Sequence, residues 1–154
     1  MDQTPVQNVD VVRSLENTLT ILNHKLKKGI TVQREYEPVP LLVNSFGSEL
    51  NQVWTNIIDN AIDAMKGKGQ LRIRTYREDG SVVVEIGDNG PGIPSEVEAH
   101  IFEPFFTTKK VGEGTGLGLD TVQRIIRRHQ GNVQVESKPG DTRFQIYLPL
   151  SEAQ

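Results

Sequence analysis

The chain has 154 residues and no cysteine, so it fits one domain and excludes disulfide and thiolate chemistry. Its hydrophobic content of 36% and charged content of 24% are those of an ordinary globular protein, and a net charge of −3 argues against nucleic-acid binding. No apolar run approaches the roughly 20 residues that span a bilayer, so we expect no membrane contact from this segment and a cytoplasmic location.

The first half of the chain is predicted to contain two helices and two strands. Apolar residues on one stripe predict a helix over 10–28, which Gly29 ends. Alternation predicts a strand over 30–36, and a short apolar run predicts another over 41–43. The stretch 51–65 has no Gly or Pro and a broad apolar arc, so we expect a long, well-buried helix there.

The second half is predicted to contain four strands and one helix. Strands are expected over 71–76 and 82–86, a helix over 119–130, and closing strands over 133–135 and 144–148. These elements predict an α/β (α+β) two-layer sandwich, in which a mixed, mostly antiparallel sheet of about five strands carries three main helices on one face. The domain is expected to occupy 10–150, between a disordered tail or linker at 1–9 and a second tail at 151–154.

Two side-chain amides lie one turn apart on the predicted 51–65 helix. Asn56 and Asn60 share one face, beside the edge of the apolar arc. A carboxamide oxygen is a neutral hard ligand that suits Mg²⁺, which usually keeps several waters and shares substrate phosphates. A solvated polar face would show the same spacing, so the helix alone leaves both interpretations open.

A tight turn, Asp88-Asn89-Gly90-Pro91-Gly92, follows the predicted central strand. The Asp88 carboxylate only accepts hydrogen bonds, so it suits the 6-amino group of adenine. Guanine presents a carbonyl oxygen there, and an unsatisfied pair of acceptors would cost about 1–3 kcal/mol. Gly90 and Gly92 allow close approach of the backbone to a ligand. The alternative is a turn with no ligand.

The segment 87–118 holds seven of the fourteen glycines. Four of them alternate in 112–118, directly before the predicted helix, where free N–H groups and the helix dipole favour anions. The spacing differs from that of the dinucleotide fingerprint and of the P-loop. The segment is therefore predicted to wrap phosphates in another way.

Four motifs in order resemble those of the ATP-binding catalytic domain of sensor histidine kinases, in the GHKL superfamily with its Bergerat nucleotide fold. They are Asn56-Ile57-Ile58-Asp59-Asn60-Ala61, Asp88-Asn89-Gly90-Pro91-Gly92, Ile101-Phe102-Glu103-Pro104-Phe105-Phe106-Thr107-Thr108-Lys109 and Gly114-Thr115-Gly116-Leu117-Gly118-Leu119. A fifth segment, Gly140-Asp141-Thr142-Arg143-Phe144, resembles the last adenine-side motif. Together they cover nearly the whole chain from about residue 10.

The resemblance implies ATP and Mg²⁺ as cofactors, with Asn60 as the metal ligand and Asn56, Asn60 and Lys109 as catalytic residues. It implies that the segment 92–114 is a lid over the nucleotide. The nucleotide-binding residues that it implies are Asn56, Asn60, Asp63, Asp88, Gly90, Gly92, Ile93, Thr107, Thr108, Lys109, Lys110, Gly114, Thr115, Gly116, Leu117, Gly118, Leu119 and Thr142. Asp63 stands where the family usually has a lysine, which puts a cationic role at that position in doubt.

The resemblance implies a protein-histidine kinase that supplies the γ-phosphoryl group of ATP in a two-component system. ATP-hydrolysing relatives carry a glutamate where this chain has Asn56, which cannot accept a proton, so we favour transfer to a protein over hydrolysis. None of the three histidines resembles an acceptor site, so the expected partner is the histidine-phosphotransfer (dimerisation) domain of the same kinase, with a response regulator downstream. An anti-sigma-type serine kinase and an ATPase module are the alternatives.

Overall fold

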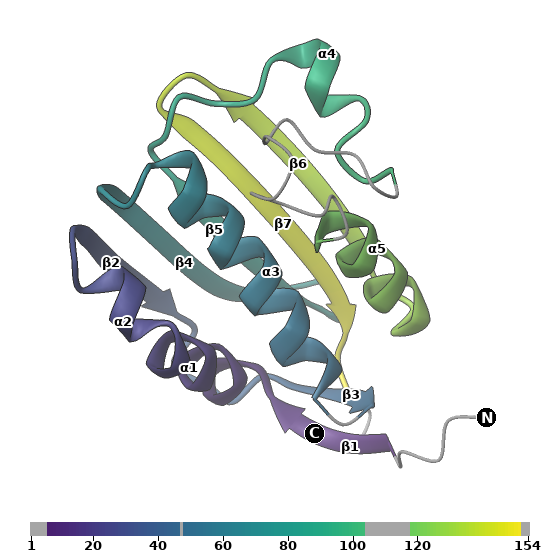
Figure 1. The fold of residues 1–154 in the computed structure, drawn as a ribbon. Helices are drawn as coiled ribbons and strands as arrows, with labels where there is room; N and C mark the ends of the chain where they lie inside the picture. Colours follow the sequence, from purple (N-terminus) through teal and green to yellow (C-terminus); the bar gives the residue numbers. More distant parts are fainter. Residues whose placement is uncertain (1–5, 47, 104–117, 152–154) are drawn as a thin grey trace.

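The centre of the fold is a five-stranded sheet (Figure 1). The computed structural model describes residues 6–46, 48–103 and 118–151. The strands lie in the order β2-β4-β5-β7-β6, with β2 parallel to β4 and the other neighbours antiparallel, which confirms the predicted mixed sheet. The strand bounds are Ile30–Tyr36 for β2, Gly69–Glu78 for β4, Ser81–Asp88 for β5, Asn132–Lys138 for β6 and Asp141–Pro149 for β7.

A second, two-stranded sheet pairs β1 (Val6–Asp10) with β3 (Leu42–Phe46). The prediction of a tail at 6–9 is therefore wrong. The sequence of β1 lacks the alternation that would predict a strand, and the strand forms because β3 supplies its backbone hydrogen bonds. The strand expected over 41–43 corresponds to β3, but it lies in this small sheet. The predicted tail at 151–154 is wrong at its first residue, because Ser151 is buried and its N–H donates to the Leu42 carbonyl across 2.8 Å.

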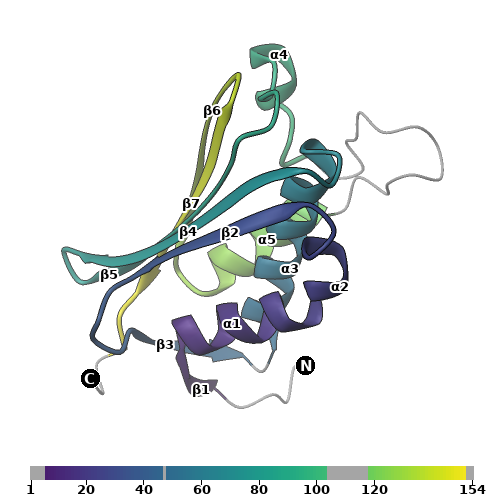
Figure 2. The same ribbon diagram turned by 90° about the vertical axis from the view of Figure 1, so that its left-hand side faces the viewer.

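The helices gather on one face of the main sheet and leave the other face uncovered (Figure 2). The three long helices are α1, α3 and α5, as predicted, and the short ones are α2 and α4. The helix expected over 10–28 is divided at Leu22, whose ψ of 2° lies outside the helical region. The bounds are Val11–Ile21 for α1, Asn23–Leu26 for α2, Glu49–Ala64 for α3, Ser95–Glu98 for α4 and Gly118–Arg128 for α5.

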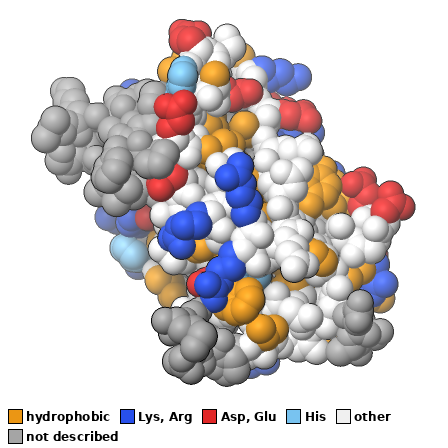
Figure 3. All heavy atoms as spheres, turned by 90° about the vertical axis from the view of Figure 1, so that its right-hand side faces the viewer, with side chains coloured by type: hydrophobic (Ala, Val, Ile, Leu, Met, Phe, Trp, Pro, Cys, Tyr) orange, Lys and Arg blue, Asp and Glu red, His pale blue; other side chains and the backbone are white. Residues whose placement is uncertain are grey.

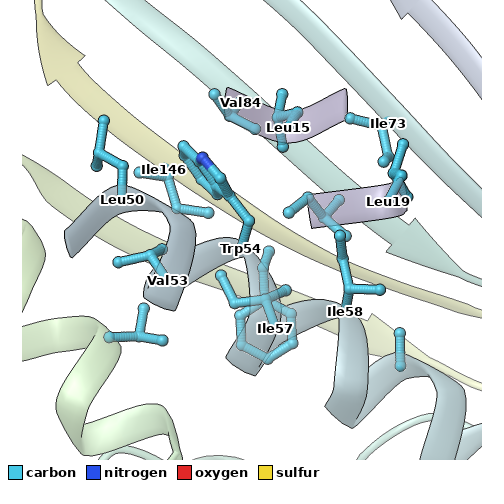
Figure 4. Packing of buried hydrophobic residues seen from close by; sticks show 14 of the residues in the cluster. Leu15, Leu19, Leu50, Val53, Trp54, Ile57, Ile58, Ile73, Val84 and Ile146 are labelled. Carbon is cyan, nitrogen blue, oxygen red and sulfur yellow. The ribbon is translucent and has the colours of Figure 1, made fainter. Parts of the chain in front are cut away.

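The hydrophobic core lies between α1, α3, α5 and the sheet, and Trp54 is at its centre (Figure 4). Trp54 is fully buried, and its indole N–H donates to the buried hydroxyl of Ser14 on α1 across 3.0 Å. Its labelled neighbours are Leu15, Leu19, Leu50, Val53, Ile57, Ile58, Ile73, Val84 and Ile146. The broad apolar arc of α3 packs in this core and holds the helix in place. Part of its polar face lies toward α5. No helix within the described residues is long and apolar enough to cross a membrane.

The C-terminal end of α5 contacts β3 and α3. His129, just after the helix, is buried and contacts the Ile125 carbonyl through Nδ1 at 2.8 Å and the Ser45 hydroxyl through Nε2 at 2.9 Å. The Arg128 guanidinium lies 4.2 Å from the ring centre of Phe46. Figure 3 shows this side of the molecule, where Lys and Arg side chains gather. These contacts hold α5 in place, and its other end faces α3.

Candidate functional site

The polar face of α3 meets the first residue of α5. The side-chain amide of Asn56 donates to the Gly118 carbonyl across 3.0 Å, which leaves the Asn56 carboxamide oxygen for another partner. The side chain of Asn60 makes no hydrogen bond to any residue in the described ranges, and its Nδ2 would be 3.7 Å from a Cβ placed on Gly118. The structure therefore brings both predicted amides and the N-terminus of α5 together.

Asp88 lies at the end of β5, on the sheet face that the helices cover. Its side chain is 4% exposed, and Oδ1 accepts a hydrogen bond from the Gly90 N–H across 2.9 Å. Within the described part of the chain, no hydrogen bond reaches Oδ2. Burial raises the pKa of Asp88 above its ordinary value, and the Gly90 N–H offsets part of that effect. Asp88 is thus a buried carboxylate with one oxygen bound and one that has no partner among the described residues.

A relay of three hydrogen-bonding groups lies beside Asp88. Thr142 on β7 is directly opposite Asp88 in the antiparallel register and is 4% exposed. Its hydroxyl is 2.7 Å from that of Ser137 on β6, and the Ser137 oxygen accepts the Ile93 N–H across 2.7 Å. A hydroxyl has one proton and two lone pairs, so one hydroxyl of this pair keeps a proton to donate elsewhere. Ser137 was not among the predicted site residues.

Two glycines seat the loop after β5 against the β6–β7 turn. The Gly90 carbonyl accepts the Gly140 N–H across 2.8 Å. Gly92 has a φ of +91°, and a Cβ there would lie 2.8 Å from the carbonyl carbon and oxygen of Lys138. Only glycine combines this conformation with such a close approach to backbone. The loop and the turn therefore form one wall beside Asp88.

These residues fit a purine nucleotide at one end and a phosphate group with its cation at the other. Asp88 and Thr142 provide an acceptor and a hydroxyl at the β5–β7 end, whereas Asn56, Asn60 and the start of α5 lie at the other. No cluster of three or more His, Cys, Asp or Glu side chains with metal-binding spacing occurs within 6–46, 48–103 and 118–151. A single amide such as Asn60 fits Mg²⁺, because that ion takes few protein ligands together with phosphates and water.

Several other predicted residues lie near this site or outside the described ranges. Asp63 is exposed on α3, one turn beyond Asn60. The hydrogen bond to Asp59 raises the pKa of Lys25, and the charge of Asp63 adds a smaller effect in the same direction. Ile93 is half-buried in the loop, and Leu119 is half-buried in the first turn of α5. The predicted residues outside the described part of the chain are Thr107, Thr108, Lys109, Lys110, Gly114, Thr115, Gly116 and Leu117.

Asp59, the acidic residue next to Asn60, points away from the site. Its carboxylate forms an ion pair with Lys25 of α2 at 2.9 Å. Both side chains are more than a third exposed, so the pair contributes little to stability, but it shows where the carboxylate faces. On α3, Asn56 and Asn60 are therefore neutral amides, and the Asp59 carboxylate is turned away from them. The other carboxylate near that face is that of Asp63, one turn beyond Asn60.

The family described as histidine kinase-, DNA gyrase B- and HSP90-like ATPase matches residues 47–152. Among curated relatives, the sensory histidine kinase/phosphatase NtrB of Rhodobacter capsulatus is 39% identical in an alignment of 133 residues. The alignment covers 78% of this chain and 37% of the relative. The signal transduction histidine-protein kinase AtoS of Escherichia coli is 43% identical over 111 residues, 71% of this chain and 18% of the relative. The chain therefore spans well under half the length of these two relatives.

The solved structure of a mycobacterial sensor histidine kinase, MprB, superposes with a TM-score of 0.84 at 28% identity and covers 95% of this chain and 98% of that one. The catalytic domain of the histidine kinase ThkA superposes with a TM-score of 0.85 at 29% identity, with 94% and 95% covered. The family implies ATP binding, which agrees with the site described above. The chain belongs to the histidine kinase-, DNA gyrase B- and HSP90-like ATPase family, and within it to the ATP-binding catalytic domains of sensor histidine kinases.

Proposed function

We propose that this domain binds Mg·ATP and supplies the γ-phosphoryl group to a histidine on the dimerisation domain of the same kinase. The observation that carries the proposal is the buried Asp88 carboxylate, one oxygen of which has no hydrogen-bond partner among the described residues. It lies at one end of a site whose other end holds Asn56, Asn60 and the start of α5. A solved relative, ShkA, at 25% identity and a TM-score of 0.83, is described as a complex with AMPPNP, which supports a nucleotide at the corresponding place.

Asp88 is the proposed receptor for the adenine 6-amino group. Its Oδ2 accepts from that group while Oδ1 stays bound to the Gly90 N–H. The hydroxyl of Thr142, opposite Asp88 in the sheet, donates to a ring nitrogen or to a bridging water. Guanine would put a carbonyl oxygen against the carboxylate, so the same residues select adenine.

Asn60 is the proposed protein ligand of Mg²⁺, and Asn56 lies beside the phosphates. When bound, Mg²⁺ would neutralise charge on the phosphate oxygens. Catalysis of phosphoryl transfer consists mostly of such charge stabilisation and of positioning. Asn56 keeps its carboxamide oriented through the bond to Gly118, and the N–H groups of the first turn of α5 favour negative charge. Lys109 remains a predicted catalytic residue outside the described ranges.

Transfer to a protein is favoured over hydrolysis by the chemistry of α3. Activation of water needs a group that accepts a proton, and the amide of Asn56 does not. Asp59 is engaged by Lys25 on another face. In the proposed reaction the imidazole nitrogen of the acceptor forms a bond to the γ-phosphorus, the bond to the bridging oxygen breaks, and ADP leaves.

The proposed partners are the dimerisation domain that carries the acceptor histidine and a response regulator downstream, and the proposed location is the cytoplasm. A solved structure of ThkA, which superposes on this chain with a TM-score of 0.81 at 26% identity, is described as a complex with the response regulator protein TrrA. Within this chain, His24 and His100 are exposed and His129 is buried. His24 contacts the Ile21 carbonyl, His100 the Glu103 carboxylate and His129 the Ile125 carbonyl.

The test is incubation with γ-labelled ATP and Mg²⁺, together with a separately purified dimerisation domain of a sensor kinase. The proposal predicts acid-labile label on the histidine of that domain, and its loss in the Asn60→Ala variant. Label on a serine of a partner protein would favour an anti-sigma-type kinase instead. Rapid release of free phosphate by the chain alone would favour an ATPase module and overturn the proposal.

A further inference from the structure

An ion-pair network lies on the uncovered face of the sheet, directly behind the proposed adenine end. The carboxylate of Asp141 accepts two hydrogen bonds from the Arg143 guanidinium, at 2.8 and 3.0 Å. It accepts a third from Arg72 of β4 at 3.3 Å. The side chain of Asp141 is only 20% exposed. The Arg143 guanidinium holds the pKa of the Asp141 carboxyl below its ordinary value.

The network crosses a strand that contributes no side chain to it. Arg72, Gly87 and Arg143 are register partners on β4, β5 and β7, so Gly87 lies between the two arginines. A Cβ on Gly87 would be 3.8 Å from the Arg72 guanidinium and 3.7 Å from Arg143 Cγ. A side chain larger than a methyl would thus displace the bridge. Gly87 directly precedes Asp88, so the bridge spans the sheet where the site begins.

Asp141 begins β7 at the turn that supports the site. Its register partner is Lys138, whose carbonyl is in contact with Gly92. Thr142, the next residue, lies opposite Asp88, and Gly140, the residue before it, donates to the Gly90 carbonyl. The hydrogen bonds of Gly90 and Ile93 therefore tie the loop after β5 to β6 and to the β6–β7 turn, and Asp141 joins that turn to β4. The loop is also bound to β4 directly, because Asn89 Oδ1 accepts the Gln70 N–H across 2.9 Å.

We propose that Asp141, held by Arg72 and Arg143, is a positioning residue for adenine recognition. The network fixes the β6–β7 turn relative to β4, and the turn in turn fixes Thr142 and the loop that carries Gly90 and Gly92. None of the three side chains reaches the helix-covered face, so the effect passes through backbone. This inference rests on the proposed role of Asp88 in binding adenine.

A double-mutant cycle on ATP affinity tests the inference. Asp141→Asn keeps the size of the side chain and removes its charge. Arg72→Met removes the guanidinium that donates from β4 to Asp141. Because partly exposed ion pairs are weak, each single change should raise the Kd for ATP only about two- to fivefold. The double variant should be no weaker than Asp141→Asn alone, and the rate of label transfer at saturating ATP should stay at the wild-type value.

The matched control is Arg74→Met, on the same strand and the same face. Arg74 pairs with Glu35 at 3.4 Å and with Glu85 at 3.6 Å, away from the turn. The inference is wrong if Asp141→Asn changes the Kd no more than this control does, or if it lowers only the melting temperature, or if the two single effects add in full. If the wild-type chain fails to prefer ATP over GTP, the assignment of Asp88 fails instead, and the two failures are thus distinguishable.

Discussion

The Asn56 amide and the Gly118 carbonyl, 3.0 Å apart, join the middle of α3 to the first residue of α5. The two residues are far apart in the sequence, yet they define the end of the site where phosphates are expected. The bond also decides which way the Asn56 carboxamide faces. Asn56 therefore has a structural role and a proposed ligand-binding role, and the two are separable by substitution.

Asn56→Asp should be more damaging than Asn56→Ala. The alanine loses one hydrogen bond, worth about 0.5–1.5 kcal/mol, whereas the aspartate puts a carboxylate against the Gly118 carbonyl and near the proposed phosphates. We expect a lower free energy of unfolding for both variants and a larger rise in the Kd for ATP for Asn56→Asp. Urea unfolding and titration calorimetry measure the two quantities. Gln52→Ala, at an exposed position on the same helix, is the control, and equal Kd values for the two Asn56 variants would contradict the prediction.

ATP binding should weaken on acidification through Asp88. Burial raises the pKa of Asp88 in the folded protein, and only the ionised carboxylate accepts from the adenine amine. The folded protein therefore takes up this proton at a higher pH than an ordinary aspartate does. Ionised Asp88 lowers the stability of the ligand-free fold above that pKa. This cost decreases as the pH falls from the raised pKa toward the ordinary pKa of an aspartate, and it is absent below both.

Calorimetric titration with ATP from pH 7 downward measures this effect. Asp88→Asn is the matched control, because the phosphates of the nucleotide titrate alike with both proteins. We expect a steeper loss of affinity for the wild type and a weaker, flatter affinity for the variant. Parallel pH profiles would mean that Asp88 does not contact the base.

Much of the site could be predicted from local sequence, because its residues sit in short motifs. Asp88, Gly90 and Gly92 lie within one stretch of five residues, and Asn56 and Asn60 are one helical turn apart. Contacts that depend on strand register could not be predicted in this way. Ser137 joins Thr142 only because β6 and β7 pair in one register, and Asp141 meets Arg72 only because the pairing of β4, β5 and β7 brings Arg72 close to the start of β7.

The same distinction explains the errors in the fold. The long helices and the main strands follow from periodicity, which a single segment carries. Strand β1 has no alternation of its own, and it forms because β3 pairs with it along its whole length. The division of the first helix at Leu22 follows from one backbone angle rather than from a change in composition.

The hydrogen bond between Trp54 and Ser14 should contribute measurably to stability. Ser14→Ala leaves the buried indole N–H without its acceptor, which costs about 1–3 kcal/mol. Trp54→Phe removes the donor as well as part of the packing. We therefore expect the double variant to lose less free energy of unfolding than the sum of the two single losses. Equilibrium unfolding in urea of the four proteins gives the coupling, and strict additivity would contradict it.

Gly92 and Gly80 offer a comparison that separates backbone strain from steric contact. Both have a positive φ, +91° and +81°, but a Cβ on Gly92 would meet the Lys138 carbonyl at 2.8 Å, whereas nothing lies within 4 Å of one on Gly80. Alanine at either position costs about 1–2 kcal/mol of backbone strain. Gly92→Ala must also push the β6–β7 turn away from the loop beside Asp88. We expect that Gly80→Ala lowers the free energy of unfolding and leaves the Kd for ATP unchanged.

Gly92→Ala should lower the free energy of unfolding further and raise the Kd for ATP, because the displaced turn carries Thr142 away from Asp88. Urea unfolding and titration calorimetry at a temperature where both variants are folded separate the two effects. If the two variants have the same Kd, the contact between Gly92 and the turn does not position the adenine end. In that case the loop after β5 adjusts to the extra methyl group without moving Asp88.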